Sequence, residues 1–377
     1  MTTEQRPRHL LHAFSTFQLG GPQARFVELA NALGPMFRHT VVAMDNRFDA
    51  GERLHPSVHW TPMSLKVIKG GALGNRGSFR QVLRNLQPDL LMSYNWGAIE
   101  WAAANLPRVC PQVHVEDGFG PEEVARQLPR RVWMRRALLG WARVPVVVIS
   151  RQLERIALQE WKLPDSRVHF IANGVNVPGC MRLQRELLAG AAIHVGTVAG
   201  LRSEKNIARL IKAFARLRSV RPARLTIVGG GSLQAELQQL AQALGVSDEV
   251  EFTGYLSNPG EKLKDFDLFA LSSDTEQQPI ALLEAMAVGM PVVATAVGDV
   301  PAILADVSPG NVCPPDDEAF SQLLLKVTQA SSNWPDWCSR GHALVSSSYA
   351  KPAMLAQWQA VWAGQLLGDT AASLSRA

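Results

Sequence analysis

The chain of 377 residues alternates short apolar runs with longer stretches in which apolar positions recur every three or four residues. The short runs predict strands, and the longer stretches predict amphipathic helices. In the first half the predicted strands are 10–13, 40–43, 90–93, 112–115, 146–149 and 168–171, with helices between them such as 22–33 and 79–86. In the second half the predicted strands are 193–197, 224–228, 250–253, 268–271 and 291–295. Two such alternations predict an α/β protein with two Rossmann-like, doubly wound domains that face a ligand cleft.

The boundary between the two domains is predicted at residues 173–189, because Asn173-Gly174-Val175-Asn176 has the composition of a turn. We therefore expect a first domain at 1–175 and a second at 176–350. A last segment, 351–377, begins with apolar residues at helical spacing, among them Trp358 and Trp362, and ends in a small polar tail. That segment predicts a final helix followed by a frayed end.

The composition is that of an ordinary globular protein, with 47% hydrophobic and 19% charged residues. No uninterrupted apolar run reaches the length of a membrane span, and the polar start of the chain does not resemble a secretory signal. We therefore expect a cytoplasmic protein. The four cysteines, Cys110, Cys180, Cys313 and Cys338, lie far apart and show no metal-binding spacing, so free thiols are expected.

The net charge of +5 suits partners that carry phosphate: nucleic acid, an anionic membrane surface or a phosphorylated substrate. No nucleic-acid-binding motif is present, which favours the last two. Six arginines between positions 126 and 143 accompany Trp133 and Trp141. This basic stretch is compatible with attachment to an anionic membrane surface, but at 100° per residue the arginines spread around the helix, so a solvated basic helix fits equally well.

Two glutamates eight positions apart, Glu276 and Glu284, flank the start of a predicted helix. The strand 268–271 precedes them, and Pro279 suits the first helical position because its missing N–H would be unbonded there. The free N–H groups and the positive dipole end between the two carboxylates suit a diphosphate, and the carboxylates can accept hydrogen bonds from sugar hydroxyls. The alternative is a solvated glutamate beside one that merely caps the helix.

This spacing, followed by Leu-Leu-Glu-Ala-Met-Ala, resembles the E-x7-E motif of retaining glycosyltransferases of family 4, which have the GT-B fold. The resemblance implies that the final helix crosses back to the first domain. It also implies that Glu284 holds the ribose hydroxyls and that Glu276 holds the hydroxyls of the donor sugar.

A second motif, the basic loop 196–207, follows a predicted strand and leads into a helix. Basic side chains at that point can neutralise a leaving diphosphate. The loop resembles the donor-diphosphate loop of the family, in which an arginine and a lysine clamp the phosphates. Lys205 matches the lysine, Gly200 stands in place of the arginine, and Arg202 is the candidate to replace its charge.

The first domain offers a glycine pair and a polar strand end. Gly20 and Gly21 sit at a strand-to-helix turn, where they form either a ligand-binding loop or a plain tight turn. His114 lies at the end of the predicted strand 112–115, where a doubly wound sheet binds ligands. The resemblance implies that His114 contacts the transferred sugar, and Glu116 and Asp117 are candidates to bind acceptor hydroxyls.

The resemblance implies a metal-independent hexosyltransferase without a cofactor that uses a nucleotide-diphosphate sugar and a glycan or polyprenyl-diphosphate-linked acceptor of surface polysaccharide synthesis. A UDP-sugar is slightly favoured over GDP-mannose because UDP donors are common, and the base stays open. Peripheral attachment to the inner face of the cell membrane is a further expectation. Glu276, His114 and Lys205 would act in catalysis. The predicted donor-binding residues are Gly20, Gly21, Arg202, Lys205, Gly230, Tyr255, Glu276, Gln277, Gln278, Pro279, Ile280 and Glu284. Two alternatives remain open: a GT-B nucleotide-sugar epimerase, and a non-catalytic nucleotide-sugar-binding partner subunit, which Gly200 favours.

Overall fold

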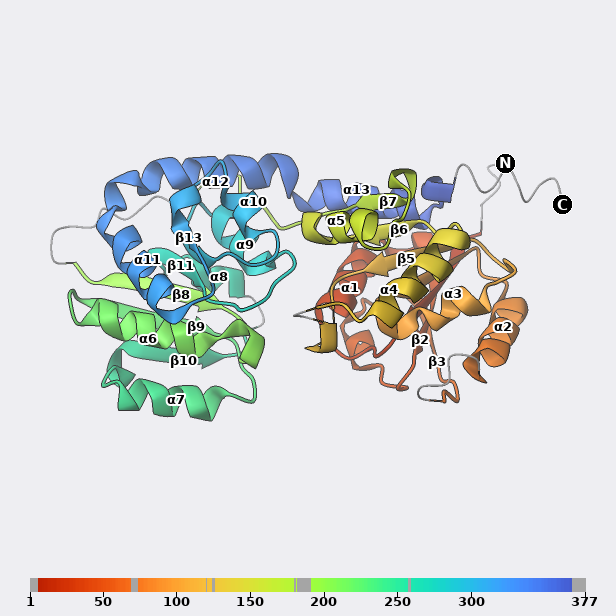
Figure 1. The fold of residues 1–377 in the computed structure, drawn as a ribbon, viewed down its shortest axis with the longest axis horizontal. Coiled ribbons are helices and arrows are strands. Elements are labelled where there is room, and N and C mark those ends of the chain that lie inside the picture. The colour runs from red at the N-terminus through yellow and green to blue at the C-terminus, as the bar shows by residue number, and fades with distance from the viewer. Residues whose placement is uncertain are drawn as a thin grey trace. The chain divides into compact units, whose positions relative to one another are not determined.

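The chain folds into two compact units, each built on a parallel sheet (Figure 1). The computed structural model describes residues 6–68, 74–119, 121–123, 126–179, 181, 191–256 and 259–367. Unit 1 comprises Met1–Ala172 and Met354–Ala377, and unit 2 comprises Asn173–Ala353. The breaks predicted after residues 175 and 350 each lie three residues from these limits. Cys180, residues 182–189 of the predicted boundary and the predicted tail 368–377 lie outside the described residues.

Unit 1 has a seven-stranded parallel sheet in the order β3-β2-β1-β4-β5-β6-β7. Its strands are β1 (Arg8–Phe14), β2 (Phe37–Ala43), β3 (His59–Met63), β4 (Leu90–Tyr94), β5 (Gln112–Glu116), β6 (Val146–Val148) and β7 (Val168–Phe170). Its helices are α1 (Gly21–Leu33), α2 (Gly74–Leu86), α3 (Glu100–Ala104), α4 (Pro129–Arg135), α5 (Arg151–Gln159) and the last turns of α13 (Lys351–Trp362).

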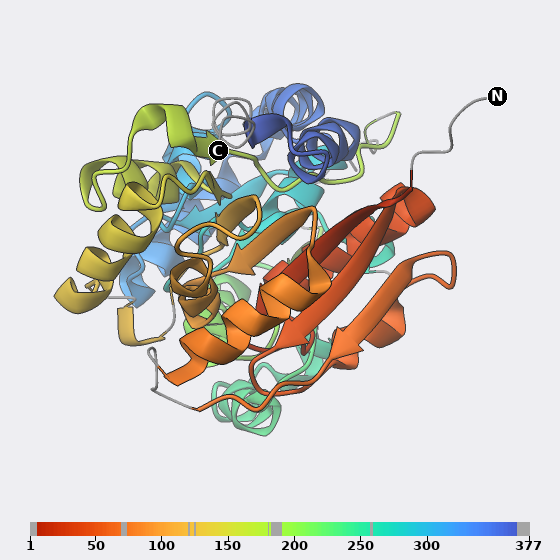
Figure 2. The same ribbon diagram turned by 90° about the vertical axis from the view of Figure 1, so that its right-hand side faces the viewer.

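Helices cover both faces of this sheet (Figure 2). Successive side chains of a strand point to opposite sides, so both faces carry apolar side chains that helices bury. On one face Leu10 packs with α1 and with Trp358 and Trp362 of α13. On the other face Leu11 packs with Phe79 of α2 and with α3. The last helix of the chain therefore completes the core of the first unit, as the sequence predicts.

Unit 2 has a six-stranded parallel sheet in the order β10-β9-β8-β11-β12-β13. Its strands are β8 (Ile193–Val198), β9 (Ala223–Val228), β10 (Val250–Gly254), β11 (Leu268–Leu271), β12 (Val292–Thr295) and β13 (Val312–Cys313). Its helices are α6 (Ile207–Arg218), α7 (Gln234–Ala243), α8 (Pro259–Leu263), α9 (Ile280–Ala287), α10 (Val300–Leu304), α11 (Asp317–Gln329) and α12 (Trp334–Ser348). Separate apolar cores lie on its two faces, one with α6 and α11 and the other with α9 and α10.

Two strands, β3 and β13, were not predicted. The side chains of β3 are exposed or half-buried, and Pro62 interrupts it, so it has neither apolar alternation nor a continuous apolar run. It lies at the edge of the sheet, where proline is tolerated. β13 has two residues, too few to give any periodic signal.

Candidate functional site

In unit 2 three loops meet at the carboxyl ends of β8, β9 and β10. The N–H of Leu201 donates to the carbonyl of Gly230 at 2.9 Å, and the N–H of Gly229 donates to that of Gly254 at 2.9 Å. Gly229 has φ +133°, and a Cβ on Gly231 would collide with the Leu201 carbonyl. Glycine at positions 229 and 231 is therefore required for the close approach between these loops.

The centre of the candidate site is an ion pair between Lys205 and Glu276, two residues that are 71 positions apart in sequence. The Lys205 Nζ donates to Glu276 Oε1 at 2.7 Å, and the Ser273 hydroxyl donates to the same oxygen at 2.8 Å. The two charged side chains are 18% and 12% exposed, so a ligand can still reach them. Two residues that the sequence assigned separate roles are therefore direct partners.

The turn that carries Lys205 is fixed at its carboxyl end by Asn206. Ser203–Lys205 form a 3₁₀ turn, and Asn206 follows it in the left-handed region at φ 41°. The Asn206 side chain caps α6 by accepting from the N–H of Arg209 at 3.1 Å. Its amide nitrogen donates to Asp274 at 3.0 Å. The lysine turn and the glutamate loop are thus tied together beside the ion pair.

Arg209, on α6, is a buried hub beneath this loop. Its guanidinium contacts Asp274 at 2.7 Å and Asp317 at 3.1 Å. It also donates to the carbonyls of Ser272 and Pro315, both at 2.8 Å. Hydrogen bonding to Lys212 and the charge of Arg209 lower the pKa of Asp317, against the opposing effect of burial. Arg209 therefore holds the segment that leads into Glu276.

The loop between Glu276 and α9 rests on the segment after β12. A Cβ on Gly298, which has φ +55°, would collide with the carbonyls of Glu276 and Gln277. The N–H of Asp299 donates to the Gln277 carbonyl at 2.8 Å. The helix begins at Ile280, so Pro279 is the N-cap and not the first helical residue as predicted. Leu282 and Leu283 donate their N–H groups to the Pro279 carbonyl at 3.2 and 3.3 Å. The N–H groups of Ile280 and Ala281 precede these first helical hydrogen bonds, and they are the ones suited to an anion.

The side chain of Gln278 turns inward. It is buried, and its Oε1 accepts from the backbone N–H of Asn173 at 2.6 Å. This bond joins the loop before α9 to the first residue of unit 2. Gln277 is half-buried, Ile280 is exposed, and Glu284 lies half-buried in the second turn of α9.

Position 200 has room for a side chain. A Cβ built on Gly200 lies 3.6 Å from the Arg202 Nε, which is ordinary contact. The Arg202 guanidinium therefore lies beside the place from which an arginine at 200 would extend. It pairs with Glu204 at 2.9 Å and is largely exposed, so this pair contributes little to stability.

Tyr255 places an exposed aromatic ring at the same edge of the sheet. Its side chain is 80% exposed, and the ring lies directly over Gly230, where an added Cβ would come within 2.9 Å of it. Gly230 thus provides the space for the ring, and the free ring face can stack on a planar base.

In unit 1 the predicted Gly20–Gly21 turn forms the start of α1, with Gly20 as its N-cap and no side-chain cap. Arg25, in the next turn of α1, forms a buried ion pair with Asp117, and the Asp117 N–H donates to Asn95 at 2.6 Å. Asp117, a predicted acceptor-binding residue, therefore already has a cationic partner for its carboxylate.

His114 and Glu116 lie within β5 and are fully buried. The Ser93 hydroxyl forms a hydrogen bond with His114 Nδ1 at 2.9 Å, and Glu116 pairs with Arg135 at 3.3 Å. Arg135 also binds Glu123, whose pKa burial would raise but the hydrogen bonds of Arg135 and Arg131 lower. The prediction that Glu116 binds acceptor hydroxyls is not supported, because its carboxylate is enclosed. His114 shows no surface through which it could touch a sugar in this conformation.

Five residues that form these contacts are not among the predicted site residues: Ser273, Arg209, Asp274, Arg25 and Arg135. Ser273 and Asp274 lie three and two residues before Glu276, and that position could have identified them. The buried arginines gave no signal, because nothing local distinguishes them from solvated ones. Within the described ranges no group of three or more His, Cys, Asp or Glu side chains is arranged to hold a metal ion.

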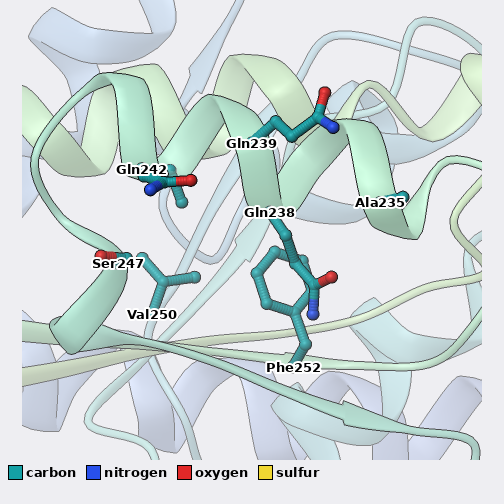
Figure 3. Close-up of a pocket in the computed structure, with 8 residues that line it drawn as sticks. Ala235, Gln238, Gln239, Gln242, Ser247, Val250 and Phe252 are labelled. Carbon is teal, nitrogen blue, oxygen red and sulfur yellow. The ribbon is translucent and has the colours of Figure 1, made fainter.

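A cavity of about 510 Å³ lies away from these residues, between α7 and β10. Gln238 and Gln242 line it from the helix, and Val250 and Phe252 line it from the strand (Figure 3). None of the predicted site residues borders it. In the part of the chain that the structure describes, no helix is both long and apolar enough to cross a bilayer.

Known protein families match both units of the chain. The family Glycosyltransferase Family 4 matches residues 19–177, and Glycosyl transferases group 1 matches residues 184–334. The fold is that of HepE from Anabaena, solved in complex with UDP, at a TM-score of 0.73, 18% identity and coverage of 94% of this chain and 100% of that one. These findings define the class, a GT-B protein with two Rossmann-like units. The chain belongs to glycosyltransferase family 4.

Two curated relatives match shorter stretches. N-acetyl-alpha-D-glucosaminyl L-malate synthase of Bacillus anthracis is 34% identical over 116 residues, 31% of this chain and 30% of the relative. The amylovoran biosynthesis glycosyltransferase AmsK of Erwinia amylovora is 33% identical over 119 residues, 29% of each chain. The chain thus matches about a third of the length of these two relatives.

Proposed function

We propose that this protein moves a hexose from a UDP-sugar to a hydroxyl of a glycan or lipid-linked acceptor, with retention of anomeric configuration, in the synthesis of a surface polysaccharide. The observation that carries the proposal is the Lys205–Glu276 ion pair beside the start of α9. It puts a cation and a hydroxyl-binding carboxylate next to the N–H groups of Ile280 and Ala281, which precede the first helical hydrogen bonds of α9. Family membership and the HepE complex with UDP support the choice of donor.

Donor binding follows from this arrangement. The diphosphate binds the N–H groups at the start of α9 and the ammonium of Lys205, with Arg202 supplying further charge. Glu284 accepts hydrogen bonds from the ribose hydroxyls, and Tyr255 stacks on the base. When the diphosphate draws Lys205 towards it, Glu276 keeps its hydrogen bond from Ser273 and accepts from the sugar hydroxyls.

Transfer then needs no base from the protein. The bond between the anomeric carbon and the phosphate oxygen breaks, and the acceptor oxygen bonds to that carbon on the same face. The acceptor proton passes to the leaving phosphate oxygen. Lys205 stabilises the negative charge that develops there, which is where electrostatic stabilisation lowers the barrier most. The step involves neither a metal ion nor a cofactor.

The class of acceptor is proposed from the relatives and the charge. AmsK is named for amylovoran biosynthesis, and the net charge of +5 suits an acceptor that carries diphosphate. A polyprenyl-diphosphate-linked sugar combines a hydroxyl acceptor with that charge.

The test is the variant Glu276→Gln, which keeps the shape and the hydrogen bonds but removes the charge. We expect transfer to fall about 100-fold or more, while affinity for UDP changes by less than about threefold. The control is Glu236→Gln, which removes an exposed carboxylate on α7 of the same unit. Turnover that is unchanged in Glu276→Gln would refute the assignment. Consumption of the donor without any acceptor would indicate an epimerase, and UDP binding without consumption would indicate a partner subunit.

A further inference from the structure

Two tryptophans of unit 1, Trp133 and Trp141, are exposed side by side. Trp133 lies on α4 and is 60% exposed, and Trp141 is 78% exposed. Their ring centroids are 6.2 Å apart, with the rings edge to face. Single exposed hydrophobic residues are common on protein surfaces, but two large aromatic rings in mutual contact form a continuous apolar patch that water does not favour.

A π-helical segment brings the two rings together. The residues Arg136–Trp141 continue α4 as a π-helix. In a regular α-helix, positions eight apart point about 80° away from each other. The wider π turn changes the angle between these two positions. Such turns are rare in proteins overall, and those that occur are often found at functional sites. A helical wheel drawn at 100° per residue cannot show this surface, which explains why the sequence pattern looks poorly amphipathic.

The arginines of this stretch fall into two sets. Arg131 and Arg135 turn inward and pair with glutamates, which leaves no charge for the surface. Four others are exposed: Arg126, Arg130, Arg136 and Arg143. Among the residues that the structure describes, Arg126 and Arg130 form no ion pair, and Arg130 lies one turn before Trp133 on the same side. Exposed arginines therefore flank the two tryptophans in sequence, and Arg130 lies beside Trp133 on α4.

We propose that this surface, made of Trp133, Trp141 and the four exposed arginines, docks unit 1 on an anionic lipid bilayer. Tryptophan prefers the boundary between headgroups and acyl chains, because its ring is apolar and its N–H is polar. Arginines beside it bind the phosphates of anionic lipids. The net charge of +5 adds long-range attraction of the same sign.

The experiment is flotation of the full chain with vesicles of phosphatidylcholine alone or with about 30% phosphatidylglycerol. We expect binding to the anionic vesicles only, weakened by about 0.5 M salt. Trp133→Ser combined with Trp141→Ser should lower the bound fraction about tenfold, and Arg126→Gln combined with Arg130→Gln should lower it severalfold. The matched control is Val220→Ser with Leu244→Ser, two exposed apolar residues of unit 2.

Each variant is also unfolded thermally with and without UDP, so that a misfolded variant or an empty donor site is recognised separately from vesicle binding. Failure of the wild type to bind anionic vesicles would overturn the proposal, as would equal binding by the tryptophan variant. A wild-type dimer that becomes a monomer in the tryptophan variant would assign the patch to a second copy of the chain. Binding to a single-stranded oligonucleotide in place of vesicles would contradict it as well.

Discussion

At the scale of single residues, the most informative position is 200, where this chain has glycine and differs from the family pattern. The family resemblance implies an arginine there, and Gly200 has the space for one. Arg202 lies beside that space and is held only by an exposed pair with Glu204. We infer that Arg202 supplies the missing charge to the donor diphosphate.

Arg202→Gln should therefore weaken UDP binding about tenfold, the effect of losing one charge-assisted hydrogen bond. Gly200→Arg should tighten it, because the new guanidinium enters open space without displacing backbone. The control is Arg224→Gln, an exposed arginine near the amino end of β9, at the opposite edge of the sheet. Calorimetric titration of UDP measures all three. If Arg202→Gln binds like the control, the charge must come from elsewhere.

Individual residues also mark the limit of what the sequence could predict. Lys205 and Glu276 were found because each lies in a motif at a strand-to-helix turn. The enclosure of Glu116 by Arg135 was not found, because the pair depends on how β5 and α4 pack and not on local pattern. The same holds for Gln278, whose polar side chain turns inward to bond the backbone of Asn173.

At the scale of elements, the apolar runs predicted every strand except β3 and β13, which lack a buried face or sufficient length. Arg209 connects α6 to two neighbouring segments of unit 2. It binds two carboxylates and two carbonyls from the loops after β11 and β13. No periodicity identifies such a hub, since its partners lie far away in sequence.

Arg209→Met should destabilise unit 2 by about 2–3 kcal/mol, because it leaves the buried carbonyls of Ser272 and Pro315 without their donor and removes the cation between Asp274 and Asp317. It should also weaken UDP binding by loosening the segment that leads to Glu276. Lys212→Met is the matched control: Lys212 binds the same Asp317 at 2.8 Å but is half exposed, so it should cost less than about 1 kcal/mol. Urea unfolding compares the two. Equal losses would show that Arg209 is not the hub.

A second element, α13, covers a buried histidine pair. His12 bonds His39 at 3.0 Å, and the ring of Trp362 lies 5.1 Å from that of His39. Burial, with the charge of His9, lowers the pKa of His39 from 6.5 to about 3, and burial also lowers that of His12. Both imidazole rings are therefore neutral in the folded protein. As the pH falls, these histidines bind protons in the unfolded chain before they do so in the folded protein.

The pKa of His39 is lower in the folded protein than in the unfolded chain. Its contribution to the free energy of unfolding is therefore fully present above pH 6.5 and is lost as the pH drops towards 3. From pH 7 to 5 this linkage should cost unit 1 about 2 kcal/mol for His39 alone. Hydrogen exchange of α13 should rise over that range in the wild type and rise less steeply in His39→Gln. The same pH dependence in both proteins would contradict this origin.

At the scale of the whole molecule, both units are parallel α/β sheets, and chemistry concentrates at the carboxyl ends of the strands, as that architecture favours. The two units differ in what they expose there. Unit 2 presents the cation of Lys205, a carboxylate, helix N–H groups and an exposed aromatic ring. In unit 1 the carboxylates of Glu116 and Asp117 are enclosed by arginines, and the exposed basic, aromatic residues lie on α4 and the π-helix that follows it. This division fits a donor site on unit 2.

The most direct test of that donor site is thermal unfolding of the full chain with UDP, GDP or ADP, compared with Lys205→Met. A ligand at about 100 times its Kd adds about 2.7 kcal/mol of stability. We predict a clear rise in Tm with UDP, smaller rises with GDP and ADP, and little rise with UDP in Lys205→Met. No rise with any nucleotide, or an equal rise with UDP in the variant, would contradict a donor diphosphate bound at Lys205.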